Sequence, residues 1–168
     1  LNGIFAAAPV PIITHCEDTP MIDAMMAKYQ AEYGDALSAE QHPDIRCREA
    51  CIKSTRLALE LARKHDARLH VLHISTADEL ALFERGPLIR ADGTRKRITA
   101  ETCVHFLHFD RADYATLGNF IKCNPAIKDE SDRLAILQAL ADDVLDVLAT
   151  DHAPHTLEEK QSPYAKAP

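Results

Sequence analysis

Three short apolar segments of this chain each end in a side chain that can bind a metal ion. The side chains are His15, His73 and Asp151, and each follows a run of β-branched and aliphatic residues typical of a buried strand. Parallel α/β folds keep their chemistry at the carboxyl ends of the strands, so we expect the three side chains to meet at one mouth. Neutral imidazole and carboxylate suit zinc. The pattern therefore predicts a metal site formed by these three residues.

Each histidine taken singly has a simpler interpretation. A histidine at a strand end is more often a hydrogen-bonded structural residue than a metal ligand. The same strand-then-ligand order occurs in three segments, and independent structural histidines have no reason to share that position. His105 and His108 flank Phe106 and Leu107, so we expect them to be partly buried or structural. His70 lies three positions before His73, so we expect it to face the helices that cover the sheet.

The rest of the chain alternates between strand-like and helix-like segments. Periodicity and helix formers predict helices at residues 21–33, 46–65, 77–85 and about 131–140. Strands are predicted at residues 12–15, 69–73, 96–102 and 144–150, with a turn at 91–94. Such alternation indicates an α/β fold with parallel strands. A complete barrel of eight strand-helix units takes about 250 residues, so a chain of 168 residues holds about four units.

Composition is that of an ordinary enzyme. The formal net charge is -7, from 19 basic and 26 acidic residues, which argues against a nucleic-acid or membrane partner. The sequence contains neither a long apolar span nor a charged-then-apolar leader. The five cysteines include no CxxC pair, so we expect reduced thiols and a cytoplasmic location.

Four segments resemble the ordered signatures of the dihydroorotases, a family of the amidohydrolase superfamily. They are His15-Cys16-Glu17-Asp18, His73-Ile74-Ser75-Thr76, residues 122–128 and residues 149–155, and residues 98–107 resemble a further strand of the family. Their order and spacing are similar to the family from about Pro11 to about Pro154. The related hydantoinases and allantoinases share the metal-binding plan. The Cys-Asn-Pro segment and the Asp-His-Ala-Pro-His ending are more similar to dihydroorotase.

The resemblance implies a zinc-dependent cyclic amidohydrolase that interconverts N-carbamoyl-L-aspartate and L-dihydroorotate in pyrimidine biosynthesis. It implies two zinc ions in the complete enzyme. His15 and His73 resemble the ligands of one ion, and Asp151 resembles the ligand of the other that also moves a proton. Asn124 resembles the residue that hydrogen-bonds the substrate ring, and His155 resembles the residue that contacts the substrate carboxylate.

Two parts of the family's metal site have no counterpart in this sequence. No two histidines are separated by a single residue, and the position of the bridging carboxylate would precede His15. We therefore expect a single partial domain, residues 1–168, equivalent to the carboxyl-terminal half of a (β/α)8 TIM-type barrel and inactive when isolated. Half a barrel exposes two sheet edges, which favours a homo-oligomer. The alternative is a non-catalytic relative that serves as a structural or regulatory partner of aspartate transcarbamoylase.

Overall fold

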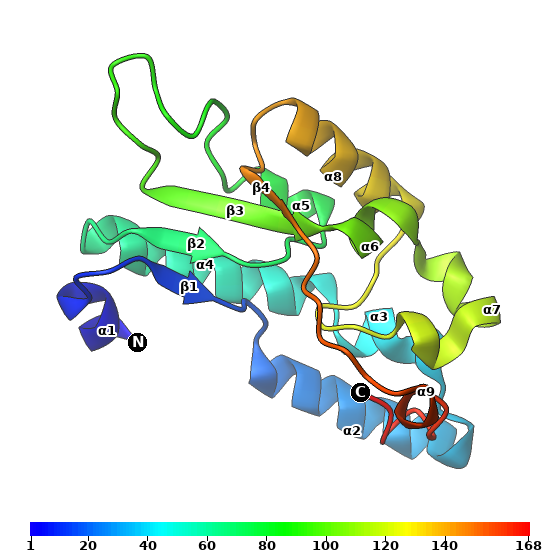
Figure 1. The fold of residues 1–168 in the computed structure, drawn as a ribbon. Coiled ribbons are helices and arrows are strands. Elements are labelled where there is room, and N and C mark those ends of the chain that lie inside the picture. Colours follow the sequence, from blue (N-terminus) through cyan, green and yellow to red (C-terminus); the bar gives the residue numbers. More distant parts are fainter.

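Four parallel strands form one sheet in the computed structural model, which describes all of residues 1–168. The strands are β1 (Ile12–Thr14), β2 (Leu69–Val71), β3 (Ile98–Cys103) and β4 (Val147–Ala149). They lie in the order β1-β2-β3-β4, and each neighbouring pair is parallel. The sheet lies in front of α4 and α5 in Figure 1. The predicted α/β fold with parallel strands is confirmed.

The segments that connect the strands carry helices of very different length. The α-helices are α1 (Asn2–Ala7), α2 (Thr19–Tyr33), α3 (His42–Ile45), α4 (Arg48–Lys64), α5 (Ala77–Leu80), α6 (Val104–His108), α7 (Tyr114–Leu117), α8 (Glu130–Ala141) and α9 (Leu157–Lys160). The short 3-10 helices are η1 (Gly34–Ala36), η2 (Ala39–Gln41), η3 (Arg111–Asp113) and η4 (Gly118–Ile121). No helix is both long enough and apolar enough to cross a membrane.

The long predicted helices are present, whereas the predicted helix at residues 77–85 is much shorter. It ends at Leu80. Beyond Leu80, the backbone N–H groups of Leu82 and Phe83 donate to the carbonyls of Glu79 and Leu80, three residues earlier, so the chain continues as a tight turn and not as an α-helix.

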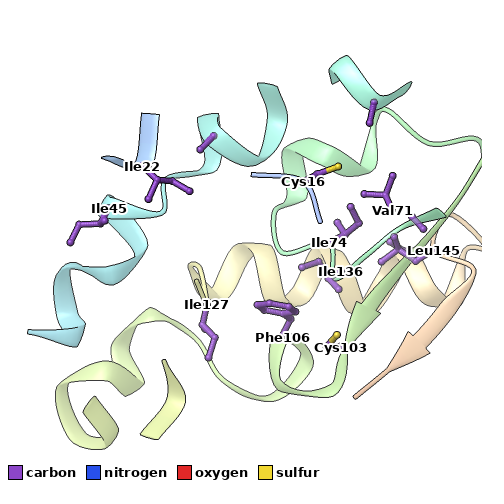
Figure 2. Close-up of a cluster of buried hydrophobic side chains, with 14 of the residues drawn as sticks. Cys16, Ile22, Ile45, Val71, Ile74, Cys103, Phe106, Ile127, Ile136 and Leu145 are labelled. Atoms are coloured by element: carbon purple, nitrogen blue, oxygen red, sulfur yellow. The ribbon is translucent and has the colours of Figure 1, made fainter. Parts of the chain in front are cut away.

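The two faces of the sheet have different surroundings. Leu69, Val71 and Ala100 are fully buried and belong to the core between the sheet and its helices. Figure 2 shows Val71, Ile74, Ile136 and Leu145 gathered in this core. Ile13 on the opposite face is 63% exposed.

His70 lies on the open face of the sheet, so the prediction that it faces the helices is wrong. Its ring nitrogens lie 2.8 Å from Oγ1 of Thr99 and 3.0 Å from Oε2 of Glu101. The prediction assumed that strand alternation continues to His73. In the structure β2 ends at Val71, and His73 has a left-handed backbone with φ of 41°, so the alternation does not extend to it.

Asp132 joins the amino-terminal ends of three helices close to the carboxyl edge of the sheet. Both of its oxygens accept hydrogen bonds from Arg48 of α4, at 3.0 and 2.9 Å. One oxygen also accepts from the backbone N–H of Ala77, the first residue of α5, at 2.8 Å. A carboxylate at helix amino termini is favourable because unpaired N–H groups and the helix dipole carry positive charge there. Asp132 therefore ties α8 to α4 and α5.

A buried ion pair joins the segment that enters β3 to the segment that enters β4. Nζ of Lys96 lies 2.9 Å from Oδ1 of Asp146, and both side chains are 3% exposed. The other carboxylate oxygen accepts from the backbone N–H of Ala100 at 3.0 Å. Because every oxygen of this carboxylate has a donor, removing one partner leaves a buried charge without compensation.

We predict that Lys96→Met lowers the free energy of unfolding by about 3 to 5 kcal/mol, because Asp146 then stays buried without its cation. The matched control is Arg85→Met, which breaks an ion pair with Asp142 whose arginine side chain is 69% exposed. That change should cost less than about 1 kcal/mol. Urea unfolding of the two variants measures both values, and equal costs would contradict the assignment.

Candidate active site

The imidazoles of His15 and His73 meet just beyond the carboxyl ends of β1 and β2. Nδ1 of His15 lies 2.8 Å from Nε2 of His73, and the ring centroids are 4.7 Å apart. Zinc binds imidazole nitrogen at about 2.0 to 2.1 Å, so two ligands of a tetrahedral ion lie about 3.3 Å apart. A small rotation of the rings would let both nitrogens bind one ion. The structure thus brings two of the predicted ligands together.

Two of the predicted site residues adopt a backbone conformation that side chains rarely allow. His73 has φ of 41° and Asp151 has φ of 45°. A left-handed backbone is uncommon outside glycine and is often found at functional positions. Each of these residues follows its strand by two positions, so the strand ends in a sharp turn at the residue that would do chemistry.

Asp151 lies at the same edge of the sheet but does not join the histidine pair. No group of three His, Cys, Asp or Glu side chains lies close enough together to form a complete metal site. Burial and the neighbouring His15 lower the pKa of His73, while the charge of Asp151 acts in the opposite direction. Asp151 therefore acts electrostatically on His73 without completing a three-ligand set.

Asp151 instead lines a cavity of about 570 Å³ together with Asn124 and His155. The three residues come from segments that follow β3 and β4. A cavity of this size accommodates a small molecule. The residues that the sequence assigned to substrate contact and proton transfer thus share one cavity, whereas His15 and His73 lie outside its lining.

His105 also lines this cavity, although the sequence favoured a structural role. Burial lowers the pKa of its imidazole, and the charge of Asp151 acts against that shift. The signal that could have revealed it is its position two residues after the end of β3, the same offset that His73 and Asp151 have from β2 and β4.

His42 holds the loop that carries Asn124. Its Nε2 lies 2.8 Å from the carbonyl oxygen of Cys123, and its Nδ1 lies 2.8 Å from the hydroxyl of Tyr164. A carbonyl only accepts, so Nε2 carries the proton and Nδ1 accepts from the tyrosine hydroxyl. Burial lowers the pKa of His42 to about 3, so the ring is neutral near pH 7. The sequence contained no signal for this contact because its partners lie far apart along the chain.

The lowered pKa of His42 makes the free energy of unfolding depend on pH. Its pKa is about 3 in the folded chain and 6.5 in the reference state, so the unfolded chain gains a proton first as the pH falls. Its contribution to stability is complete above pH 6.5 and is lost toward pH 3.

We predict that His42→Gln removes up to about 1.4 kcal/mol per pH unit from the dependence of stability on pH between about pH 6.5 and pH 5. The amide of glutamine can donate to Cys123 and accept from Tyr164, so it replaces both contacts without titrating. Unfolding by urea at a series of pH values measures the slope. An unchanged slope would show that His42 does not titrate in this way.

Dihydroorotases match almost the whole chain, although no family model matches it. The relative from Pelotomaculum thermopropionicum is 35% identical over 161 residues, covering 94% of this chain and 34% of that protein. The Bacillus pumilus protein is 34% identical over 157 residues, which cover 94% of this chain and 34% of that protein. The Latilactobacillus sakei protein is 32% identical over 165 residues, which cover 97% of this chain and 36% of that protein. The chain therefore spans about a third of the length of these curated relatives.

Solved hydantoinases share the fold. One D-hydantoinase aligns with a TM-score of 0.84 at 19% identity, covering 99% of this chain and 37% of that chain. An L-hydantoinase from Arthrobacter aurescens aligns with a TM-score of 0.80 at 21% identity, covering 98% of this chain and 36% of that chain. A dihydroorotase from Saccharomyces cerevisiae, solved with 5-fluoroorotic acid, aligns with a TM-score of 0.59 at 17% identity. The alignment covers 71% of this chain and 33% of that chain. These similarities confirm the expected fold, part of a TIM-type barrel.

Proposed function

Since the resemblance to the dihydroorotases is confirmed over at least 94% of the chain, we propose that this chain forms the site-bearing part of a cyclic amidohydrolase. The proposed reaction is the reversible interconversion of N-carbamoyl-L-aspartate and L-dihydroorotate in pyrimidine biosynthesis. The observation that carries the proposal is the approach of His15 Nδ1 to His73 Nε2, at 2.8 Å, at the two strand ends where the family motifs lie.

The donor set fits zinc. His15 and His73 would hold one ion through the two nitrogens that face each other, and Asp151 would hold a second ion through its carboxylate. Bound zinc would polarise the ring carbonyl and lower the pKa of a water molecule to about 7. The proposal for residues 1–168 is one partial domain that supplies these three ligands.

Asp151 is the residue that we propose moves the proton during ring opening. A carboxylate can accept a proton as the water oxygen bonds to the amide carbon, and can pass it to the ring nitrogen as the carbon–nitrogen bond breaks. Asn124 would hydrogen-bond the ring, and His155 would contact the substrate carboxylate. All three line the same cavity, so a ring bound there can reach them together.

The sequence relatives favour dihydroorotase over hydantoinase. The solved hydantoinases are 19% to 22% identical and support only the fold, whereas the curated dihydroorotases are 32% to 35% identical. We propose a cytoplasmic enzyme whose open sheet edges support self-association or association with aspartate transcarbamoylase. A non-catalytic regulatory chain is the competing outcome, and loss of turnover on changing Asp151 would eliminate it.

In the complete protein, Asp151→Asn should lower turnover of dihydroorotate by about 10² to 10⁴-fold, because the amide keeps the shape but cannot accept a proton. Substrate binding should change less. Steady-state kinetics measure both, with dihydroorotate and hydantoin as competing substrates. Retention of most of the turnover would refute the role of Asp151.

His155→Ala should instead raise the Michaelis constant about tenfold to a hundredfold, since it deletes a charge-assisted contact worth about 1.5 to 3 kcal/mol. The zinc content should stay the same. Metal analysis beside the kinetics separates the two roles. Loss of zinc from this variant would make His155 a ligand and contradict the assignment.

The isolated 168-residue chain should open dihydroorotate at no measurable rate, because its sequence contains no His-x-His pair to complete a two-metal site. An absorbance assay of the zinc-loaded chain checks this. Zinc-dependent turnover by the chain alone would overturn the two-metal interpretation.

A further inference from the structure

A buried carboxylate beside His15 has no role in the proposed reaction. Oε2 of Glu17 lies 3.0 Å from Nε2 of His15, and the side chain of Glu17 is 2% exposed. The same oxygen accepts a hydrogen bond from the guanidinium of Arg46. Oε1 is buried without a hydrogen-bond partner. The bonds of this carboxylate therefore go to one metal-ligand candidate and one cation.

Glu17 decides which nitrogen of His15 carries the proton. The guanidinium of Arg46 donates a charge-assisted hydrogen bond to Oε2, and this pairing keeps the carboxylate ionised. An ionised carboxylate only accepts, so Nε2 of His15 must donate. In the neutral ring Nδ1 then has the free lone pair, and this is the atom that faces His73.

We propose that Glu17 and Arg46 form a positioning pair that fixes the tautomer and the ring orientation of His15, so that Nδ1 is presented as a metal ligand. The pair rests on the proposed function, because it has this use only if a metal binds at His15 and His73. Arg46 has a separate part: its donated hydrogen bond keeps Oε2 in place beside the ring. Outer partners of ligand histidines typically change metal affinity by about 10 to 100-fold.

The test uses the 168-residue chain and two readouts. Nitrogen NMR of labelled histidine in the metal-free chain should find His15 protonated almost entirely at Nε2, and Glu17→Ala should raise the share of the Nδ1-protonated form. Competition titration with zinc should find the affinity of Glu17→Ala lowered about 10 to 100-fold.

The matched control is Asp18→Ala, which removes a carboxylate one residue away. Asp18 pairs with Lys53 at 2.9 Å and accepts from the backbone N–H of Met21, so it contacts neither histidine. Its zinc affinity and the His15 tautomer should match the unchanged chain. An equal loss of affinity in both variants would overturn the proposal.

The Glu17→Gln variant distinguishes a role of Glu17 in positioning His15 from a role in folding alone. Arg46 donates to the oxygen that contacts His15, so it should orient the amide with its oxygen toward the ring, and the Nε2-protonated tautomer should be kept. If circular dichroism shows that Glu17→Ala is unfolded, the tautomer of His15 in Glu17→Gln decides whether Glu17 positions the ring. Loss of the tautomer in Glu17→Gln, or an unchanged share of the Nδ1-protonated form in a folded Glu17→Ala, overturns the proposal. Absence of zinc binding in the unchanged chain would instead overturn the proposed metal site, while the metal-free tautomer would still decide the role of Glu17.

Discussion

Parallel pairing of the strands determines where the chemistry of this chain lies. Thr14 pairs with Val71, and Cys103 pairs with Ala149, so the ends of β1 and β2 are in register with each other, as are the ends of β3 and β4. Residues that follow paired strand ends emerge at one edge of the sheet. A shift of register by one residue would reverse every side chain of a strand and move His15 away from His73. The site therefore depends on backbone hydrogen bonds of the sheet before it depends on any side-chain contact.

Polar residues around the site form hydrogen bonds with groups that lie far away in sequence. His42 is held by Cys123 and Tyr164, and Glu17 is held by Arg46. A typical hydrogen bond contributes about 1 kcal/mol net, but a buried polar group without a partner costs about 1 to 3 kcal/mol. Such contacts add little to the total stability. Their effect is to make alternative positions of the loops unfavourable, which fixes the residues that line the cavity.

The sequence was informative wherever a local pattern has one structural meaning. Apolar runs located the strands, helical periodicity located α2 and α4, and ligand-type residues at strand ends located His15 and His73. Predictions failed where the outcome depends on backbone geometry or on distant partners. The direction of His70 could not be predicted because the left-handed turn at His73 is invisible in residue types.

The position of Asp151 apart from the histidine pair is compatible with the proposed two-metal site, in which the histidines and Asp151 would hold different ions. His15 and His73 would hold one ion and Asp151 would hold the other, so the proposal does not require all three side chains to meet at one point. A carboxylate that moves a proton must also reach the substrate, which the histidines need not do. Asp151 meets this requirement because it lines the cavity with Asn124 and His155, while His15 and His73 lie outside that lining. Since one edge of the sheet carries all of these residues, the strand that a residue follows determines whether it lines the cavity or meets the other histidine.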